Sequence, residues 1–215
     1  MHDGRPDQMA HAATPVASPE GHSAILDYSK TTPISGGASF SFANRVERFV
    51  FQIVWLFLAR WTPPNFSPWR IWLLKQFGAR CDTGAMIAAD VKVWLPRNLH
   101  LGENASIGPG VNCYTMGPIS IGPRTIISQN AHLCAGSHDV ADPDFQLIAR
   151  RVTIGADVWI AAEAFVAPGV TIGDGVVLAA RGCAFTALEP WTIYRGNPAV
   201  AVRPRVWRKR PGTSD

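Results

Sequence analysis

The stretch IGADVWIAAEAFVAPGVTIG, residues 154–173, carries an aliphatic side chain at every sixth position. A period of six matches neither the 3.6-residue turn of a helix nor an ordinary hairpin spacing. It is typical of a solenoid of short strands and tight turns, with three hexads in each 18-residue coil. The spacing extends far beyond this stretch, and thirteen of its fifteen positions are Ile, Val or Leu. These positions are Ile87, Val93, Leu99, Leu101, Ile107, Cys113, Ile121, Ile127, Leu133, Ile154, Ile160, Val166, Ile172, Leu178 and Ala184.

Small or branched residues often stand two positions before a hexad residue, and they let the walls of a coil approach closely. They are Ala105, Val111, Val158, Ala164, Val170 and Val176. The repeat is interrupted between Leu133 and Ile154, where the step is 21 residues instead of six. An insertion into a solenoid projects as a loop from one corner, and such loops often carry function. We therefore expect a functional loop at residues 135–151, which contains the sequence AGSHDVADPDF.

The composition excludes several classes of protein. The 19 Gly and 17 Pro in 215 residues argue against a coiled coil or a helix bundle, and the eight Trp and ten Phe need burial, which argues against global disorder. The net charge of +4 comes without basic stripes interleaved with aromatic residues, so a nucleic-acid partner is not expected. The four cysteines lack CxxC spacing, and no secretory signal is visible, which together favour a cytoplasmic protein without a structural metal.

Four regions follow along the chain. Residues 1–40 predict a flexible arm, 41–80 an aromatic-rich helical segment, 81–200 the solenoid, and 201–215 a basic C-terminal tail.

The helical segment has two interpretations. Its apolar run of eleven residues, 49–59, is too short to cross a hydrocarbon core of about 30 Å. The two helices could pack on the domain or on a neighbouring subunit. Alternatively, residues 45–77 could make a peripheral contact with the inner membrane face, with Trp and Arg at the depth of the headgroups.

Residues 45–205 resemble the hexapeptide-repeat acyltransferases, and within them most closely the acetyltransferases of colanic acid and exopolysaccharide biosynthesis. The matching segments are ISIG at 119–122, GSHD at 136–139, residues 158–173 and GNPA at 196–199. The core is also similar to maltose and galactoside acetyltransferases. The resemblance implies an all-β fold, a left-handed parallel β-helix, assembled as a homotrimer with active sites between subunits. It further implies acetyl-CoA as co-substrate and a sugar or glycan hydroxyl as acceptor.

The family's catalytic histidine corresponds to His138 in the inserted loop. Histidine suits the removal of a proton from a weakly nucleophilic alcohol, because its ordinary pKa lies near ~6.5. A carboxylate that orients the imidazole would be Asp142, although related enzymes use a Glu farther along this loop and no Glu lies between Glu103 and Glu163. Asn112 corresponds to an asparagine that faces the acceptor, with a turn-forming role as the alternative.

The donor site is likewise implied by the resemblance. Ala162 and Ala180 match small positions along the pantetheine arm, and Trp159 matches a tryptophan near the thioester. Arg203 matches a basic residue near the nucleotide phosphates, where charge-assisted hydrogen bonds would form. Packing remains the alternative for Trp159, and a solvated tail the alternative for Arg203.

Other readings stay open at this point. The chain could be an N- or O-acyltransferase acting on serine or an amino sugar, or a catalytically silent scaffold. A covalent mechanism through Cys113 or Cys134 and a zinc site built from His100, His132 and His138 are weaker alternatives. Cys113 occupies an inward position of the repeat, so burial in the core explains a cysteine at this place.

Overall fold

The computed structural model describes residues 40–207, so the predicted arm at 1–40 lies almost entirely outside the described residues, as does the end of the tail at 208–215. The described chain opens with α1 (Phe42–Leu58), the 3-10 turn η3 (Pro64–Phe66) and α2 (Ser67–Gln76). All the remaining regular structure is short strands, apart from the 3-10 turn η4 (Pro96–Asn98).

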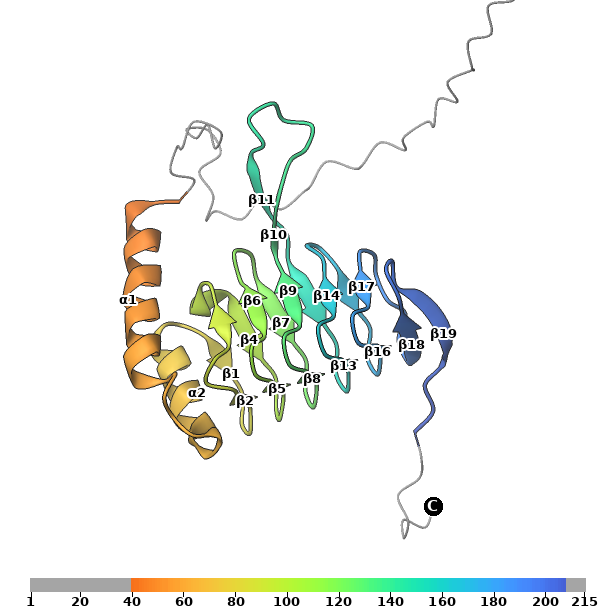
Figure 1. Cartoon of the computed structure of the whole chain (residues 1–215), viewed down its shortest axis with the longest axis horizontal. Helices are drawn as coiled ribbons and strands as arrows, with labels where there is room; N and C mark the ends of the chain where they lie inside the picture. The colour runs from red at the N-terminus through yellow and green to blue at the C-terminus, as the bar shows by residue number, and fades with distance from the viewer. Residues whose placement is uncertain (1–39, 208–215) are drawn as a thin grey trace, which may run out of the picture.

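The strands form three parallel sheets that wrap around one core, which confirms the predicted β-solenoid (Figure 1). Sheet A contains β1 (Arg80–Cys81), β4 (Leu99–Leu101), β7 (Ile119–Ile121), β12 (Val152–Ile154) and β15 (Thr171–Ile172). Sheet B contains β2 (Met86–Ile87), β5 (Ser106–Ile107), β8 (Ile126–Ile127), β13 (Trp159–Ile160), β16 (Val177–Leu178), β18 (Thr192–Arg195) and the antiparallel β19 (Val200–Pro204). Sheet C contains β3 (Lys92–Val93), β6 (Asn112–Tyr114), β9 (His132–Cys134), β14 (Phe165–Val166) and β17 (Cys183–Ala184).

The core lies inside the coils and is built from the hexad residues. Each of the fifteen predicted inward positions is at most 2% exposed, and the six small or branched residues that precede them are equally buried. Successive side chains of a strand point to opposite faces, so a two-residue strand places one side chain inside and one outside. The coils stack in register, for example Ile107 on Ile127 and Ile127 on Ile160.

The irregularities of the repeat all fall at one corner of the solenoid. Inward residues of sheet B are 20 apart in the first coils (Ile87, Ile107, Ile127) and 18 apart later (Ile160, Leu178). The two additional residues lie where the chain passes from sheet C to sheet A, at 94–98 and again at 115–118. The 15-residue insertion occupies the same corner in the next coil. Three successive coils are therefore widened at one edge.

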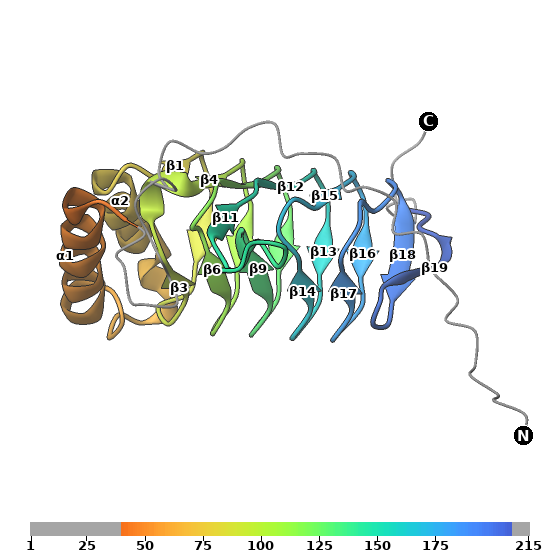
Figure 2. The ribbon, with the colours of Figure 1, turned by 90° about the horizontal axis from the view of Figure 1, so that it is seen from above.

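The helices cover the N-terminal end of the solenoid, where Figure 2 shows them beside the first coil. Trp55 donates its indole N–H to the carbonyl of Ala89 at 3.1 Å, and Gln52 donates to the carbonyl of Val93 at 3.1 Å. The buried guanidinium of Arg70 donates to four acceptors, among them the carbonyl of Ile87 at 2.8 Å. These bonds pair the helices with backbone carbonyl groups of the first coil. No helix within residues 40–207 is long and apolar enough to cross a membrane.

The boundary predicted at residue 200 does not match the structure. Residues 200–204 form β19, which pairs antiparallel with β18 and closes the C-terminal end of sheet B. Arg205 then donates to the carbonyls of Asp157 at 2.6 Å and Gly175 at 2.9 Å. The first residues of the predicted tail are thus part of the solenoid, because they supply a last strand and an arginine that ties two coils together.

Candidate active site

The insertion forms a two-stranded hairpin that projects from the widened corner, as Figure 1 shows. Its strands are β10 (Gly136–His138) and β11 (Leu147–Ala149), and His138 lies opposite Leu147 in the register. A methyl group added to Gly136 would lie 2.4 Å from Cε of Met116 and 2.8 Å from Cε1 of Tyr114. A side chain at this position would therefore force Met116 and Tyr114, or the base of the hairpin, to move. This contact fixes where the hairpin leaves the solenoid.

The imidazole of His138 is exposed and held by the hairpin itself. Its Nδ1 lies 2.6 Å from the carbonyl oxygen of Phe145. A carbonyl oxygen only accepts hydrogen bonds, so this contact requires the proton of the neutral ring to be on Nδ1. The other nitrogen, Nε2, then carries the lone pair and can accept a proton from a substrate. A positive φ of 49° at Phe145 turns its backbone at this point.

The predicted orienting role of Asp142 does not match this geometry. One carboxylate oxygen of Asp142 accepts the backbone N–H of Asp144 at 2.7 Å, which closes a local turn at the tip of the loop. Asp139 caps the N–H of Ala141 in the same way, at 3.0 Å. Short acidic side chains readily form such turns with backbone two residues ahead. The backbone carbonyl of Phe145, rather than a carboxylate, therefore fixes the tautomer of His138.

The outer face of sheet C runs from the hairpin corner to the next corner of the solenoid. Its outward residues stack in register from coil to coil, and the row reads Lys92, Asn112, His132, Phe165 and Cys183. The amide nitrogen of Asn112 lies 3.3 Å from Nε2 of His132, and the ring of Phe165 meets the His132 ring edge-on at 5.4 Å. Burial lowers the pKa of His132, which favours the neutral ring. Asn112 thus lies on this face with a polar partner.

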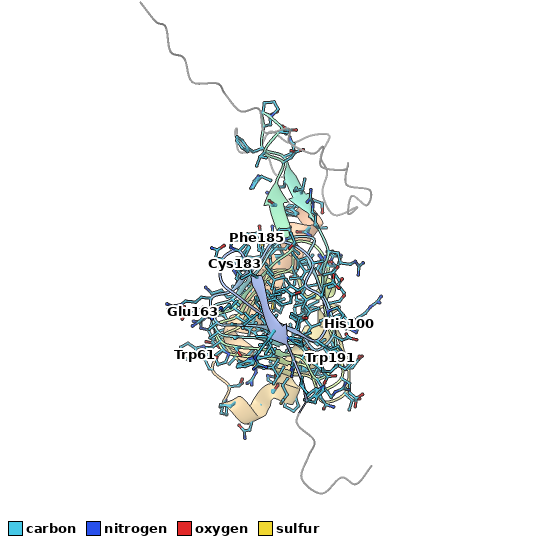
Figure 3. All side chains as sticks on the ribbon, turned by 90° about the vertical axis from the view of Figure 1, so that its right-hand side faces the viewer. Trp61, His100, Glu163, Cys183, Phe185 and Trp191 are labelled. Carbon is cyan, nitrogen blue, oxygen red and sulfur yellow. The ribbon has the colours of Figure 1, made fainter. Side chains whose placement is uncertain are left out.

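The two predicted alanines lie at the other edge of the same face. Ala162 and Ala180 occupy equivalent turns of successive coils, and the carbonyl of Ala162 accepts the N–H of Arg181 at 2.9 Å. An ion pair between Arg181 and Glu163, at 2.6 Å, marks this corner. In the end view of Figure 3, Cys183 and Phe185 lie between Glu163 and the hairpin, whereas His100 lies on the opposite side.

The other two predicted donor residues lie on sheet B. Trp159 is 46% exposed on β13 and donates its indole N–H to the hydroxyl of Ser128 at 2.9 Å. Arg203 is exposed on β19, opposite Ile193 of β18. Trp159 and the two alanines therefore lie near the corner between sheets B and C. No hydrogen bond within residues 40–207 joins Trp159, Asn112 or Asp142 to His138.

The structure also bears on the nucleophile and metal alternatives. Cys113 is fully buried, and burial raises its pKa to about 12, so a reactive thiolate is disfavoured. Cys134 is half-buried, burial raises its pKa, and its thiol contacts the carbonyl of Gly136. His100, His132 and His138 come from sheet A, sheet C and the hairpin. No group of three or more His, Cys, Asp or Glu side chains in the described part of the chain could hold a metal ion.

An aromatic cluster that the sequence did not predict lies beneath the hairpin. The ring of Trp94 packs on Tyr114 at 5.8 Å and on Phe40 at 4.8 Å, and the guanidinium of Arg48 lies 4.1 Å from the centre of the Trp94 ring. Leu147 of the hairpin and the three rings all pack against the buried side chains of Met116 and Ala149. A coil length of 20 residues would have predicted this contact, because Trp94 and Tyr114 are 20 residues apart and therefore lie side by side in successive coils. Asn112 and His132 are also 20 residues apart.

Comparisons with known proteins agree with this architecture. Residues 151–181 match the model of the bacterial transferase hexapeptide family (six repeats). A protein of Escherichia coli K12, named as a colanic acid biosynthesis acetyltransferase, is 42% identical over 167 residues, which cover 78% of this chain and 92% of the relative.

Solved structures share the fold at lower identity. A maltose O-acetyltransferase from Clostridium difficile 630 is 22% identical and superposes with a TM-score of 0.70, covering 78% of this chain and 90% of its own. A hexapeptide-repeat acetyltransferase from Vibrio cholerae, solved in complex with acetyl-CoA, is 21% identical with a TM-score of 0.61, and the match covers 75% of this chain and 87% of the other.

Proposed function

Because the chain belongs to the hexapeptide-repeat acetyltransferases, as a relative of the colanic acid enzyme, we propose that it moves an acetyl group from acetyl-CoA to a sugar hydroxyl, with His138 as the general base. The acceptor of this proposal is an exopolysaccharide or a lipid-linked glycan intermediate. The observation that carries the proposal is the contact of Nδ1 with the Phe145 carbonyl, since it leaves Nε2 as the proton acceptor.

The proposed reaction is a direct transfer without an acyl-enzyme. Nε2 of His138 takes the proton of the acceptor hydroxyl while the hydroxyl oxygen attacks the thioester carbonyl. The carbon–sulfur bond then breaks, and the departing CoA sulfur takes the proton back from Nε2. The imidazolium that exists between these steps is stabilised through Nδ1–H by the carbonyl of Phe145. Asn112, held by His132, orients the acceptor on sheet C.

The proposed donor site uses the corner of Ala162 and Ala180, with Trp159 beside the thioester and Arg203 near the phosphates. Small side chains at a corner let the pantetheine arm approach the backbone closely. Within one chain this corner and the hairpin lie at opposite edges of sheet C, which supports a homotrimer whose sites combine the hairpin of one subunit with the corner of the next. Sedimentation of the purified protein tests this assembly, and a monomer at working concentration would contradict it.

We also propose that residues 45–77 bind the membrane surface where a lipid-linked acceptor is presented. The outward face of α1 and the following turn expose large apolar side chains: Phe42, Val46, Phe49, Val50, Ile53, Leu56, Phe57, Leu58 and Trp61. Arg45, Arg60 and Lys75 are exposed in the same segment, and their positive charges suit anionic headgroups. Exposed apolar surface of this extent marks an interaction site.

The membrane contact is tested by co-sedimentation with vesicles that contain anionic lipid. A double variant, Phe49→Ser with Phe57→Ser, removes two side chains that are each 68% exposed and leaves the packed face of α1 intact. We expect this variant to stay in the supernatant while the parent protein pellets. Equal pelleting of both folded proteins would refute the membrane contact.

The donor and acceptor classes are tested in two steps. Calorimetric titration with acetyl-CoA, CoA and a longer acyl-CoA measures whether the donor binds. Saturable binding of acetyl-CoA is then followed by a screen of sugars for release of free CoA thiol. Binding without transfer to any sugar would refute the acceptor class, and no binding by a folded protein would refute the donor.

A further inference from the structure

Arg48 is a half-buried cation in the aromatic cluster beneath the hairpin, and no acidic side chain within residues 40–207 forms an ion pair with it. Its Nε donates to the side-chain oxygen of Asn44 at 3.0 Å, and no hydrogen bond or ion pair within residues 40–207 involves its two terminal nitrogens. The adjacent carboxylate, Glu47, is paired with Arg97 instead. Burial lowers the pKa of Arg48, so the protein holds this charge partly out of water.

Two aromatic rings of the cluster contact this guanidinium. Its central carbon lies 4.1 Å from the centre of the Trp94 ring and 5.2 Å from that of Phe40. A guanidinium stacked on aromatic rings keeps its edge free for in-plane hydrogen bonds. That edge matches the paired oxygens of a phosphate or a carboxylate, and partial desolvation strengthens such a contact.

The same cluster reaches the face of the hairpin that carries His138. Side chains two residues apart on a strand point the same way, so His138 shares a face with Gly136, whose missing side chain would meet Met116 and Tyr114. Leu147, opposite His138 in the register, packs against Met116 and Ala149, on which Trp94 and Tyr114 also pack. A continuous row of contacts therefore joins the base of the hairpin to Arg48: Tyr114 lies against Gly136, Trp94 packs on Tyr114, and Arg48 lies over Trp94.

We infer that Arg48 is the anion-recognising residue of the acceptor site, with Trp94 and Tyr114 as the surface on which the sugar ring lies. The acceptor then carries a phosphate or a carboxylate in addition to the hydroxyl that is acetylated. This inference rests on the proposed function, since it names the acceptor class of that site. The phosphates of the donor are a separate source of the same chemistry, and Arg203, proposed to bind them, lies on β19 at the far end of the solenoid (Figure 2).

The experiment compares Arg48→Met with the matched control Arg45→Met. Both changes remove one positive charge from α1 and one guanidinium stacked on an aromatic ring, but Arg45 is exposed and stacks on the exposed Phe42 at 5.8 Å. Calorimetric titration uses glucose 1-phosphate, glucuronate and the neutral methyl glucoside as probes. These three ligands share a hexose ring and differ in the charged group.

For the parent protein we expect at least one anionic sugar to bind about tenfold or more tightly than the neutral one. Arg48→Met should abolish this preference, Arg45→Met should keep it, and neither should change the dissociation constant for CoA. A preference for glucose 1-phosphate indicates a sugar phosphate acceptor, and one for glucuronate a uronic acid. If Arg48→Met does not fold, as judged by circular dichroism, Arg48→Lys carries the test, with a partial loss of preference expected.

Equal affinity for charged and neutral sugars, no binding of either anion, or equal losses in both variants would overturn the inference. Weaker CoA binding in Arg48→Met alone would assign the residue to the donor instead. Acetyl transfer to a neutral sugar at an equal rate would overturn the inference and leave the proposed function standing. A preference for anionic sugars that depends on Arg48, without acetylation of any sugar, would support the inference and overturn the proposed function.

Discussion

The contact at the base of the hairpin predicts a specific cost for Gly136→Ala. The new methyl group would lie 2.4 Å from Cε and 3.0 Å from Sδ of the buried Met116, and 2.8 Å from Cε1 of Tyr114. Ordinary carbon–carbon contacts are about 3.5–4.0 Å, so the hairpin or Met116 must move by about 1 Å. Overpacking of this kind destabilises a protein by about 1–3 kcal/mol. A displacement of about 1 Å at a catalytic group lowers turnover by about 10²-fold.

A double-mutant cycle with Met116→Ala separates this contact from other effects. Met116→Ala alone leaves a cavity and should cost about 2–5 kcal/mol. In the double variant the new methyl group occupies part of that cavity, so we expect a favourable coupling free energy of about 1 kcal/mol or more and a partial recovery of turnover. Urea unfolding and the CoA-release assay measure the two quantities.

The control is Gly173→Ala, at the corner between sheets A and B. Its methyl group would lie 2.7 Å from the backbone nitrogen of Pro190. This variant should lose stability but retain turnover per folded molecule, because the corner does not carry the hairpin. Parental stability and turnover in Gly136→Ala, or additive free energies in the cycle, would refute the reasoning.

Three further predictions concern single side chains. N-Ethylmaleimide at pH 8 should leave Cys113 unlabelled in the native protein and label it after unfolding, because burial raises its pKa to about 12; mass spectrometry that finds rapid native labelling would contradict its burial. Asp142→Asn should lower turnover far less than the ~10²–10⁴-fold loss typical of a missing general base, since the amide oxygen still accepts the N–H of Asp144; a loss of that size would restore the carboxylate as the orienting group. Burial lowers the pKa of His132, so below about pH 6.5 the unfolded chain gains a proton that the folded protein resists, and stability falls with the pH. His132→Gln should reduce the fall of the urea unfolding midpoint between pH 7.5 and 5. An unchanged dependence of the midpoint on pH would exclude His132 as the source of this fall.

The hexad pattern predicted the core of the solenoid because one side of a coil is six residues long. A side chain such as Ile127 is inward for that reason alone, and it is fully buried. The 15-residue insertion also predicted a loop that projects from one corner, and in the structure this loop contains the hairpin of β10 and β11. Both features depend on local sequence period, which a single chain reveals directly.

The contacts within the site needed the three-dimensional structure. The hydrogen-bond partner of His138 is a backbone carbonyl, which residue types cannot reveal, whereas the sequence predicts the carboxylate of Asp142 as that partner. The pairing of Asn112 with His132 depends on a coil of 20 residues, whereas the ideal repeat has 18. Arg48 joins the site only because α1 packs against the first coil.

The general base is tested most directly by His138→Ala, assayed together with donor binding. The imidazole is exposed on the hairpin, so its removal should leave the fold and the dissociation constant for acetyl-CoA unchanged. Steady-state turnover on an accepted sugar should fall by ~10²–10⁴-fold. Retained turnover in this variant, with parental donor affinity, would contradict the role of His138.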